Sequence, residues 1–374
     1  MEDLRAWIEV DLDAIIHNLK LIKSIAPKSQ IMAIIKANAY GHGAISVAKT
    51  VLANGASWLG VAMVEEGIAL REAGLAAPIL ILGVVPEAEV PLAVKWNLST
   101  TFTDFKGAEV LARAGKALGK KASGQLKIDT GMHRLGVYPE KAAELLKACE
   151  KLDGLKVEGM FTHLATADCE DNSLAKKQVE QIINLRKELG NKCPPLVHWA
   201  NSAAALYLAE DSSFIRAGIA LYGLKPSADP FWDKLKPALS LKARISRIER
   251  VEANQPIGYG ASYYTKEPCQ IVTVPVGYGD GYTRRLSHKG TEVLIGGNRY
   301  PVVGNICMDQ LMVEIPLKKQ IDVTDEVTLI GSQGSEEISA EELAIKSDTI
   351  HYEIITELSI RLERIYKKGS STVR

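Results

Sequence analysis

The sequence predicts an α/β protein: a (β/α)₈, TIM-like barrel followed by a mainly antiparallel β C-terminal domain. Three observations support this fold. Eight strand-like segments alternate with helix-like segments, which is the repeat that builds a barrel of parallel strands. Polar and ionisable residues gather where five of these strands end, at the edge that carries active sites in such barrels. Beyond Pro237, strand-like segments and glycine-rich turns replace the helical periodicity. An open, doubly wound sheet is the structural alternative.

The composition is that of an ordinary soluble globular protein and excludes several functional classes. Of the 374 residues, 47% are hydrophobic and 24% are charged. Lysine plus arginine and aspartate plus glutamate number 45 each, so no basic excess predicts nucleic-acid binding. No apolar run reaches the ~20 residues of a membrane helix, and the acidic N-terminus is unlike a signal peptide. The five cysteines form no C-x-x-C pair, which predicts reduced thiols and a cytoplasmic location.

The first elements are a strand and a helix. Residues 7–12 alternate apolar and acidic side chains, which predicts a half-exposed strand. Residues 1–12 are expected to pack with the C-terminal domain. Asp11 or Asp13 can then cap a helix predicted over residues 14–25, because a carboxylate accepts the free N–H groups of a first turn.

Apolar runs predict the barrel strands, and amphipathic segments between them predict the helices. The strands are expected at residues 31–36, 58–62, 78–83, 98–102, 124–129, 157–163, 196–200 and 214–219. Helices are expected, among others, over residues 86–96, 107–120, 140–151 and 173–189. We assign residues 1–237 to the barrel domain.

Residues 238–374 are assigned to the β-rich second domain. Its predicted strands lie at residues 272–276, 292–295, 310–315 and 327–330. Helical periodicity returns only over residues 339–366, which predicts one terminal helical region.

The most informative stretch is the first barrel strand and the residues after it. The apolar run that starts at Ile31 ends on Lys36. A lysine in apolar surroundings has a lowered pKa and presents a free amine, which a Schiff-base lysine needs. Alone, such a lysine is more often a strand end whose amine reaches solvent. The residues that follow, Ala37 to Gly43, give the pattern a more specific meaning.

Other strands also end in residues that can carry chemistry. Lys127 and Asp129 end the fifth predicted strand, and Arg134 follows shortly after. The sixth, seventh and eighth strands lead into His163, Asn201-Ser202, and Arg216-Ala217-Gly218-Ile219. Each could be a structural group, but a coincidence across five strand ends is much less frequent. The sequence therefore predicts one site at the carboxyl edge of the barrel.

The segment Ile35-Lys36-Ala37-Asn38-Ala39-Tyr40-Gly41-His42-Gly43 resembles the pyridoxal-phosphate lysine motif of alanine racemases, and the similarity extends from Trp7 to Tyr352-Glu353. The resemblance implies that Lys36 binds pyridoxal 5'-phosphate covalently, and it implies no metal. Arg216 would face the pyridine nitrogen, with His163 beside the ring and linked to that arginine. The remaining cofactor-binding residues implied are Tyr40, Asn201, Ser202, Gly218, Ile219 and Tyr352.

The resemblance also implies a second base, because one base acting on one face does not efficiently invert a carbon centre. Lys36 would serve one face of the substrate and Tyr259 the other. A free tyrosine has a pKa of about 10, so we expect the His163–Arg216 pair to provide a cationic neighbourhood for the phenol.

The substrate carboxylate would be held by Arg134 and by the backbone N–H of Met308. Lys127 matches a position that is often carbamylated in the family, where the added negative charge orients that arginine. Three further supporting residues match family positions: Tyr278, Cys307 and Asp309. Asn305 and His351 depart from the common pattern, in which an arginine and an asparagine are usual.

The family's second domain reaches the active site of the other subunit, so the resemblance implies a homodimer with shared active sites. The predicted function is interconversion of L-alanine and D-alanine, supplying D-alanine for peptidoglycan synthesis in the cytoplasm. A decarboxylase of related architecture is one alternative, but it is expected to place an acid where this chain has Arg216. A non-catalytic barrel that binds the cofactor would lack the second domain, and a broad-specificity racemase is the nearest rival.

Overall fold

The computed structural model describes residues 4–369 and 371–373, and it divides into two compact units. One unit contains residues 14–39 and 44–236. The other contains the N-terminal residues up to Asp13, residues 40–43, and the chain from Pro237 onward. Residues 1–12 were expected to pack with the C-terminal domain. For residues 1–3 this expectation lies outside the described residues.

The first unit is the predicted barrel. Its parallel strands follow the order β8-β7-β6-β5-β4-β3-β2-β9, and a parallel bridge between Asn201 and Arg216 joins the two end strands. This closure confirms the barrel and rules out the open sheet. The strands are β2 (Gln30–Ile34), β3 (Trp58–Val61), β4 (Ile79–Val84), β5 (Ser99–Phe102), β6 (Ala122–Lys127), β7 (Leu155–Phe161), β8 (Leu196–His198) and β9 (Phe214–Ala217).

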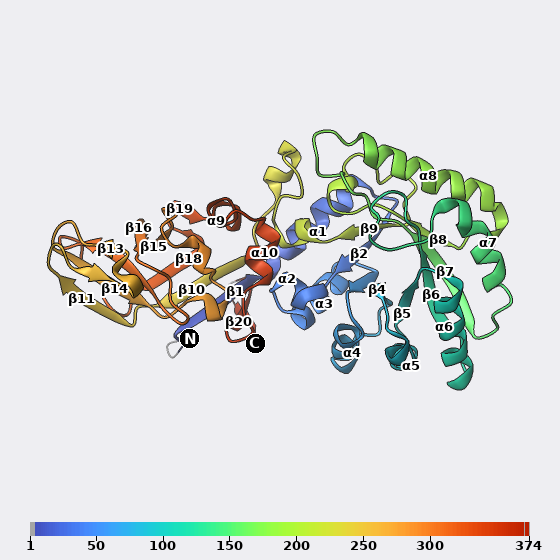
Figure 1. Ribbon diagram of the computed structural model, residues 1–374, viewed down its shortest axis with the longest axis horizontal. Coiled ribbons are helices and arrows are strands. Elements are labelled where there is room, and N and C mark those ends of the chain that lie inside the picture. Colours follow the sequence, from blue (N-terminus) through green and yellow to red (C-terminus); the bar gives the residue numbers. More distant parts are fainter. Residues whose placement is uncertain (1–3, 370, 374) are drawn as a thin grey trace. The chain divides into compact units, whose positions relative to one another are not determined.

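Helices lie outside these strands (Figure 1) and bury apolar stripes against them. The α-helices of the barrel are α1 (Leu12–Ile25), α3 (Ala44–Ala53), α4 (Val64–Glu72), α5 (Val90–Lys95), α6 (Phe105–Ala117), α7 (Pro139–Cys149) and α8 (Ser173–Leu189). Short 3₁₀ turns add η1 (Glu87–Glu89), η2 (Gly190–Lys192), η3 (Ala203–Ala205), η4 (Ile219–Tyr222) and η5 (Pro230–Lys234). Helix α1 begins early because the Asp11 carboxylate accepts the N–H of Asp13 at 2.9 Å.

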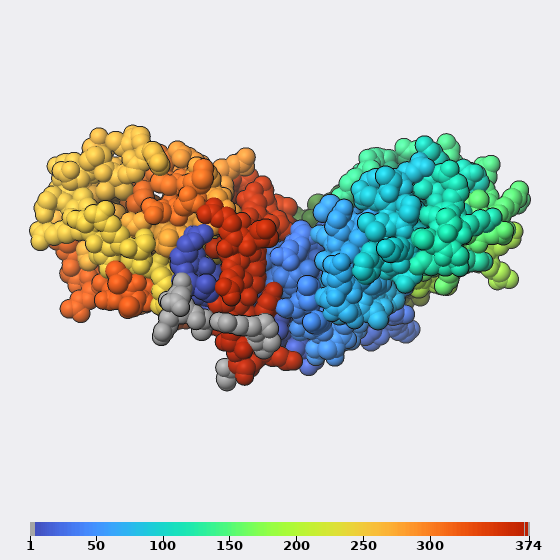
Figure 2. Space-filling view, turned by 90° about the horizontal axis from the view of Figure 1, so that it is seen from below, coloured from blue at the N-terminus to red at the C-terminus, as the bar shows by residue number. Residues whose placement is uncertain are grey.

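The second unit is built on antiparallel strands, in the order β11-β14-β17-β16-β15-β18-β10-β1-β20-β21, with β19 beside β18. The exception is β1, which pairs with β20 in parallel, and Figure 2 shows the dark blue N-terminal segment beside the red C-terminal one. The strands are β1 (Ala6–Asp11), β10 (Leu239–Arg244), β11 (Arg247–Val251), β12 (Pro256–Ile257), β13 (Tyr263–Tyr264), β14 (Cys269–Val274), β15 (Glu292–Ile295), β16 (Asn298–Val303), β17 (Leu311–Pro316), β18 (Glu326–Gln333), β19 (Glu336–Ile338), β20 (Glu363–Lys368) and β21 (Ser371–Val373).

Two sequence-based expectations need correction. The terminal helical region is broken: α9 (Ala340–Ser347) and α10 (His351–Thr356) are helices, but residues 363–368 form β20. Pairing with β1 decides this, because it satisfies the backbone of β20 and buries Ile365. The first barrel strand ends at Ile34, so Lys36 follows the strand and opens a short turn, α2 (Lys36–Tyr40). Among the described residues, no helix has the length and apolar character needed to cross a membrane.

Candidate active site

Lys36 lies just beyond the carboxyl end of β2, where a barrel carries its chemistry. Its side chain is half-buried, and burial is the main cause that lowers the pKa of its amine. The positive charge of Arg134 lowers this pKa further, while the negative charge of Glu66 raises it. The amine is therefore biased toward its neutral, nucleophilic form.

The turn after Lys36 has an unusual backbone. Ala37, Asn38, Ala39 and Tyr40 all have left-handed dihedral angles, with φ of 51°, 52°, 55° and 52°. Consecutive non-glycine residues rarely adopt this conformation because the β-carbon crowds the following carbonyl oxygen. Specific contacts must therefore hold this turn in place.

Arg216 is the central charged group of the barrel site. It is buried, and burial lowers its pKa to about 9, so the guanidinium is still charged at neutral pH. Nη1 donates to Nδ1 of His198 at 2.9 Å. Nη2 donates to the carbonyl of Thr162 at 2.8 Å and to that of Trp199 at 3.0 Å. It also lies 3.1 Å from Nδ1 of His163. Among the described residues, every hydrogen bond of this guanidinium leaves from Nη1 or Nη2.

Both histidines that face Arg216 are neutral. Burial lowers the pKa of His163 well below its usual value, and so do Arg216, Lys127, Arg134 and Lys36. Burial and the charge of Arg216 also lower the pKa of His198. In the His163–Arg216 pair, Arg216 therefore carries the charge, and His163 accepts a hydrogen bond from it.

Lys127 ends β6 inside the barrel and is almost fully buried, at 6% exposure. Its amine lies 4.4 Å from the centroid of the Phe161 ring. Burial, followed by the charges of Arg216 and Arg134, lowers its pKa well below the usual value. A small cavity of about 10 Å³ lies among Lys127, Asp129, Met132, Arg134, Thr162, His163 and neighbouring residues. Four basic side chains from separate barrel strands and loops thus act on His163.

The ends of β8 and β9 meet next to this cluster of side chains. The hydroxyl of Ser202 accepts the backbone N–H of Gly218 at 3.0 Å. Asn201 accepts the N–H of Ala204 at 2.9 Å, and Ile219 opens η4 directly after Gly218. The structure therefore brings together the four residues that the sequence placed at these two strand ends.

In the second unit, Tyr40 and Tyr352 lie close together, with ring centroids 6.3 Å apart. Tyr40 is buried, which raises its pKa to about 12 and keeps its phenol protonated. His351, one of the two departures from the family pattern, stands beside Tyr352 with a centroid distance of 5.0 Å. The two tyrosines that the sequence analysis named as cofactor-binding residues are therefore neighbours in this unit.

Three neighbouring loops of the second unit carry the other predicted residues. Tyr278 donates its N–H to the carbonyl of Cys307 at 3.1 Å, and Gly279 donates to that of Met308 at 2.8 Å. A side chain at Gly277 would overlap both of these carbonyl oxygens, so the close approach requires glycine. Asn305, the other departure, donates to the carbonyl of Tyr259 at 2.8 Å and so joins the third loop.

The side chains on these loops point to solvent in the single chain. Tyr259 is 69% exposed and Met308 is 54% exposed, whereas Val274, Val276 and Gly277 of the neighbouring loop are buried. Asp309 is exposed and binds Arg361 at 2.8 Å. No group of three metal-binding side chains occurs within the part of the chain that the structure describes.

Two family models cover most of the chain. The alanine racemase N-terminal domain matches residues 10–226, and the alanine racemase C-terminal domain matches residues 238–366. The chain belongs to the alanine racemase family. The resemblance inferred from the lysine motif is therefore confirmed.

Relatives within the alanine racemase family match over nearly the whole chain. The alanine racemase of Symbiobacterium thermophilum is 44% identical over 364 residues, covering 96% of each chain. The solved alanine racemase of Clostridium difficile 630 has a TM-score of 0.95 at 38% identity, covering 100% of this chain and 98% of that one. A histidine racemase of Leuconostoc mesenteroides subsp. sake has a TM-score of 0.91 at 30% identity, covering 98% and 99%.

Three residues of this candidate site had no predicted role. His198 was visible at a strand end, and its position was the one signal available. Its Nδ1 accepts from Arg216, so its proton lies on Nε2 and is donated to Gln125 at 2.8 Å. Gln125 and Glu66 gave no signal of a role in the site, because His198 and Ala37, the partners that connect them to it, lie far away in the sequence.

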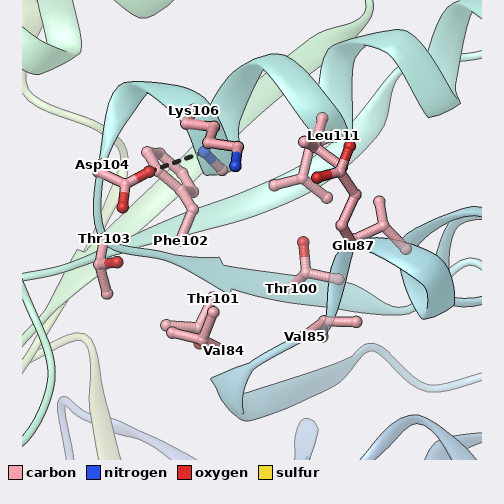
Figure 3. A pocket seen from close by; sticks show the side chains of 13 residues that line it. Val84, Val85, Glu87, Thr100, Thr101, Phe102, Thr103, Asp104, Lys106 and Leu111 are labelled. Carbon is pink, nitrogen blue, oxygen red and sulfur yellow. Dashed lines mark hydrogen bonds between the residues drawn. The ribbon is translucent and has the colours of Figure 1, made fainter.

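A larger cavity, of about 190 Å³, lies elsewhere in the barrel unit (Figure 3). Its walls come from the ends of β4 and β5 and from the start of α6. They are mostly valines, threonines, Phe102 and Leu111. Asp104, at its rim, caps α6 by accepting the N–H of Gly107 at 2.8 Å. None of the predicted site residues lines this cavity, so we place the chemistry at the charged cluster around His163.

Proposed function

We propose that this protein interconverts L-alanine and D-alanine, using pyridoxal 5'-phosphate bound covalently to Lys36. One observation carries the proposal: the Arg216 guanidinium lies 3.1 Å from His163, and Lys127 and Arg134 line the same small cavity as that histidine, with Lys36 close enough to act on it. The two guanidinium groups suit a ligand with a phosphate and a carboxylate. The lowered pKa of Lys36 suits the covalent bond, because a neutral amine is needed to form it.

The residues present fit this cofactor. Arg216 uses Nη1 and Nη2 for protein acceptors, which leaves the Nε–H as the donor for the ring nitrogen. For the phosphate we propose the hydroxyls of Tyr40, Ser202 and Tyr352, the amide of Asn201, and the backbone N–H groups of Gly218 and Ile219. When bound, pyridoxal phosphate withdraws electrons from the substrate Cα and makes its proton removable.

Arg216 also favours racemisation over the decarboxylase alternative. A guanidinium donates hydrogen bonds but accepts none, so it keeps the ring nitrogen unprotonated. The groups around it are neutral histidines and carbonyls, with no carboxylate among its hydrogen-bond partners in the described chain. With the cofactor bound, Arg216 would weaken the electron sink and so limit side reactions that need a long-lived carbanion.

Proton transfer needs two groups on opposite faces of the substrate Cα. We assign Lys36 to the face from which D-alanine loses its proton, and Tyr259 to the opposite face. Arg134 and the backbone N–H of Met308 would hold the substrate carboxylate, supported by Tyr278, Cys307 and Asp309. Carbamylation of Lys127 is part of the proposal, because its lowered pKa provides the neutral amine that reacts with carbon dioxide.

The exposure of Tyr259 and Met308 supports a homodimer with shared active sites. Large side chains on packed, glycine-dependent loops are typical of surfaces that meet a partner. We propose that these loops complete the site of the partner subunit, with the barrel domain at residues 1–237 and the second domain at residues 238–374. Supply of D-alanine for peptidoglycan in the cytoplasm is the cellular role that follows.

Two variants test the assignment. Lys36→Ala should abolish the visible absorbance of the bound cofactor and its trapping by borohydride. Tyr259→Phe should keep that absorbance but lower turnover by about 100-fold or more, mostly in the direction that starts from L-alanine. Normal racemisation by Tyr259→Phe in both directions would refute the two-base assignment. A substrate panel with serine, lysine and histidine separates alanine specificity from the broad-specificity alternative and from the activity named for the Leuconostoc relative.

A further inference from the structure

The left-handed turn after Lys36 is costly and must be stabilised from outside. This conformation is unfavourable for every non-glycine residue, and four follow one another from Ala37 to Tyr40. Within the turn, the N–H of Ala39 donates to the carbonyl of Ile35 at 2.8 Å. Asn38 accepts the N–H of Ala44 at 2.8 Å, which closes the far end.

The near end, next to Lys36, is held by Glu66. One carboxylate oxygen, Oε1, accepts the N–H of Ala37 at 2.6 Å. The other, Oε2, accepts the N–H of Ala62 at 2.7 Å and that of Met63 at 3.3 Å. The carboxylate therefore joins the turn after β2 to the turn after β3, using both of its oxygens.

A helix cap does not account for these contacts. Glu66 lies in the first turn of α4, where a glutamate often accepts the N–H of the residue before the helix. That role explains the bond from Met63, which is the longest of the three. The shorter bonds, from Ala37 and Ala62, leave the helix, and the bond from Ala37 reaches a residue 29 positions earlier in the sequence.

Among the charged groups that act on the Lys36 amine, Glu66 carries a negative charge. Arg134 is the positive group that opposes the lysine charge, and His163 is the neutral titratable group within reach. Glu66 thus acts on the lysine in two ways: through the backbone of the next residue and through its charge.

We propose that Glu66 is a positioning residue for Lys36: its carboxylate holds the left-handed turn and so fixes the direction of the lysine amine. The role in turnover rests on the function proposed above. The contact between Glu66 and the turn does not depend on it.

The test compares Glu66→Gln with Glu65→Gln in the full-length chain. Glu65 is the neighbouring residue in the same helical turn and is exposed, so its variant controls for loss of one negative charge. A glutamine at position 66 has one accepting oxygen, so it can serve only one of the two turns. We expect Glu66→Gln to lower kcat about 10- to 100-fold with little change in KM, and Glu65→Gln to resemble the parent.

A second measurement reports on the lysine directly. The pH dependence of Lys36 acetylation, followed by mass spectrometry in the cofactor-free chain, gives the midpoint of its titration. Removing the negative charge of Glu66 should move this midpoint to lower pH, whereas Glu65→Gln should leave it in place. This measurement does not depend on racemisation of alanine. It therefore distinguishes failure of this inference from failure of the proposed function.

Rescue by glycine is the third readout. Ala37 is exposed, and glycine adopts left-handed angles without the penalty, so the turn should need its clamp less in Ala37→Gly. We expect Ala37→Gly to recover about fivefold of the turnover lost in Glu66→Gln. If Glu66→Gln matches Glu65→Gln in turnover and in the Lys36 midpoint, the inference is overturned. The inference is also overturned if Glu66→Gln loses turnover while the Lys36 titration midpoint is unchanged and Ala37→Gly restores nothing. Glu66 would then only stabilise helix α4.

Discussion

The barrel site and the loops of the second unit prepare their residues in opposite ways. In the barrel, Arg216 is buried and surrounded by protein acceptors that fix both of its terminal nitrogens. On the loops, the backbone beneath Tyr259 and Met308 is fixed by hydrogen bonds, but the side chains are exposed. The contrast fits the proposal that the barrel organises its half of the chemistry alone, whereas the loops complete the site of a partner subunit.

The largest expected effect comes from breaking the barrel half. Arg216→Met leaves acceptors on His163, His198, Thr162 and Trp199 without their donor. Unpaired buried groups are costly, so we expect the free energy of unfolding to fall by about 3 kcal/mol and racemisation to fall by about 1000-fold. Denaturant unfolding and alanine turnover measure the two effects.

Tyr259→Phe is the matched change on the loops. It removes one exposed hydroxyl, so its unfolding free energy should stay within about 0.5 kcal/mol of the parent despite the loss of turnover. A large loss of stability in Tyr259→Phe, or none in Arg216→Met, would break the comparison.

An intermediate effect is expected from acid. The folded pKa values of His163 and His198 are lowered, so the folded state resists protons that the unfolded state binds. Their contribution to stability is complete above the unfolded pKa of about 6.5 and is lost as the pH falls from there toward the folded values. In that range each histidine contributes a slope of up to about 1.4 kcal/mol per pH unit.

His198→Gln should remove one such contribution. Unfolding free energies measured between pH 7 and pH 5 should therefore fall less steeply in this variant than in the parent. An equal slope in both proteins would show that His198 is protonated in the folded state, against the geometry of its bond from Arg216.

The smallest expected effect concerns the loop that carries Tyr259. Asn305→Ala removes the hydrogen bonds to the carbonyl of Tyr259 and to the hydroxyl of Ser262, at 2.8 and 3.0 Å. Both partners remain near solvent, so we expect a stability loss of about 1 kcal/mol or less and a turnover loss of about threefold. The control is Asn298→Ala, in a turn that carries no predicted site residue. Equal turnover of the two variants would show that Asn305 does not position Tyr259.

Local patterns were enough for much of the fold. Helix α8 occupies the predicted residues 173–189. The barrel strands lie within a few residues of their predicted places. Most of their residues are buried, and several of these strands are apolar runs of the kind found in parallel sheets covered on both faces. Residues 363–368 misled the same reasoning, because their strand exists only through pairing with residues at the other end of the chain.

For the candidate site too, some features follow from local sequence and others only from tertiary contacts. The sequence by itself determined the family, through the run around Lys36, and placed ionisable side chains at the right edge of the barrel, because that edge follows from the strand order.

Only the tertiary structure decided that His163 and His198 are neutral, that Arg216 turns Nη1 and Nη2 toward them, and that the residues after Lys36 form a left-handed turn held by Glu66. The physical reason is that protonation states and strained dihedral angles depend on which groups lie within a few ångströms in space. A linear pattern does not specify those neighbours.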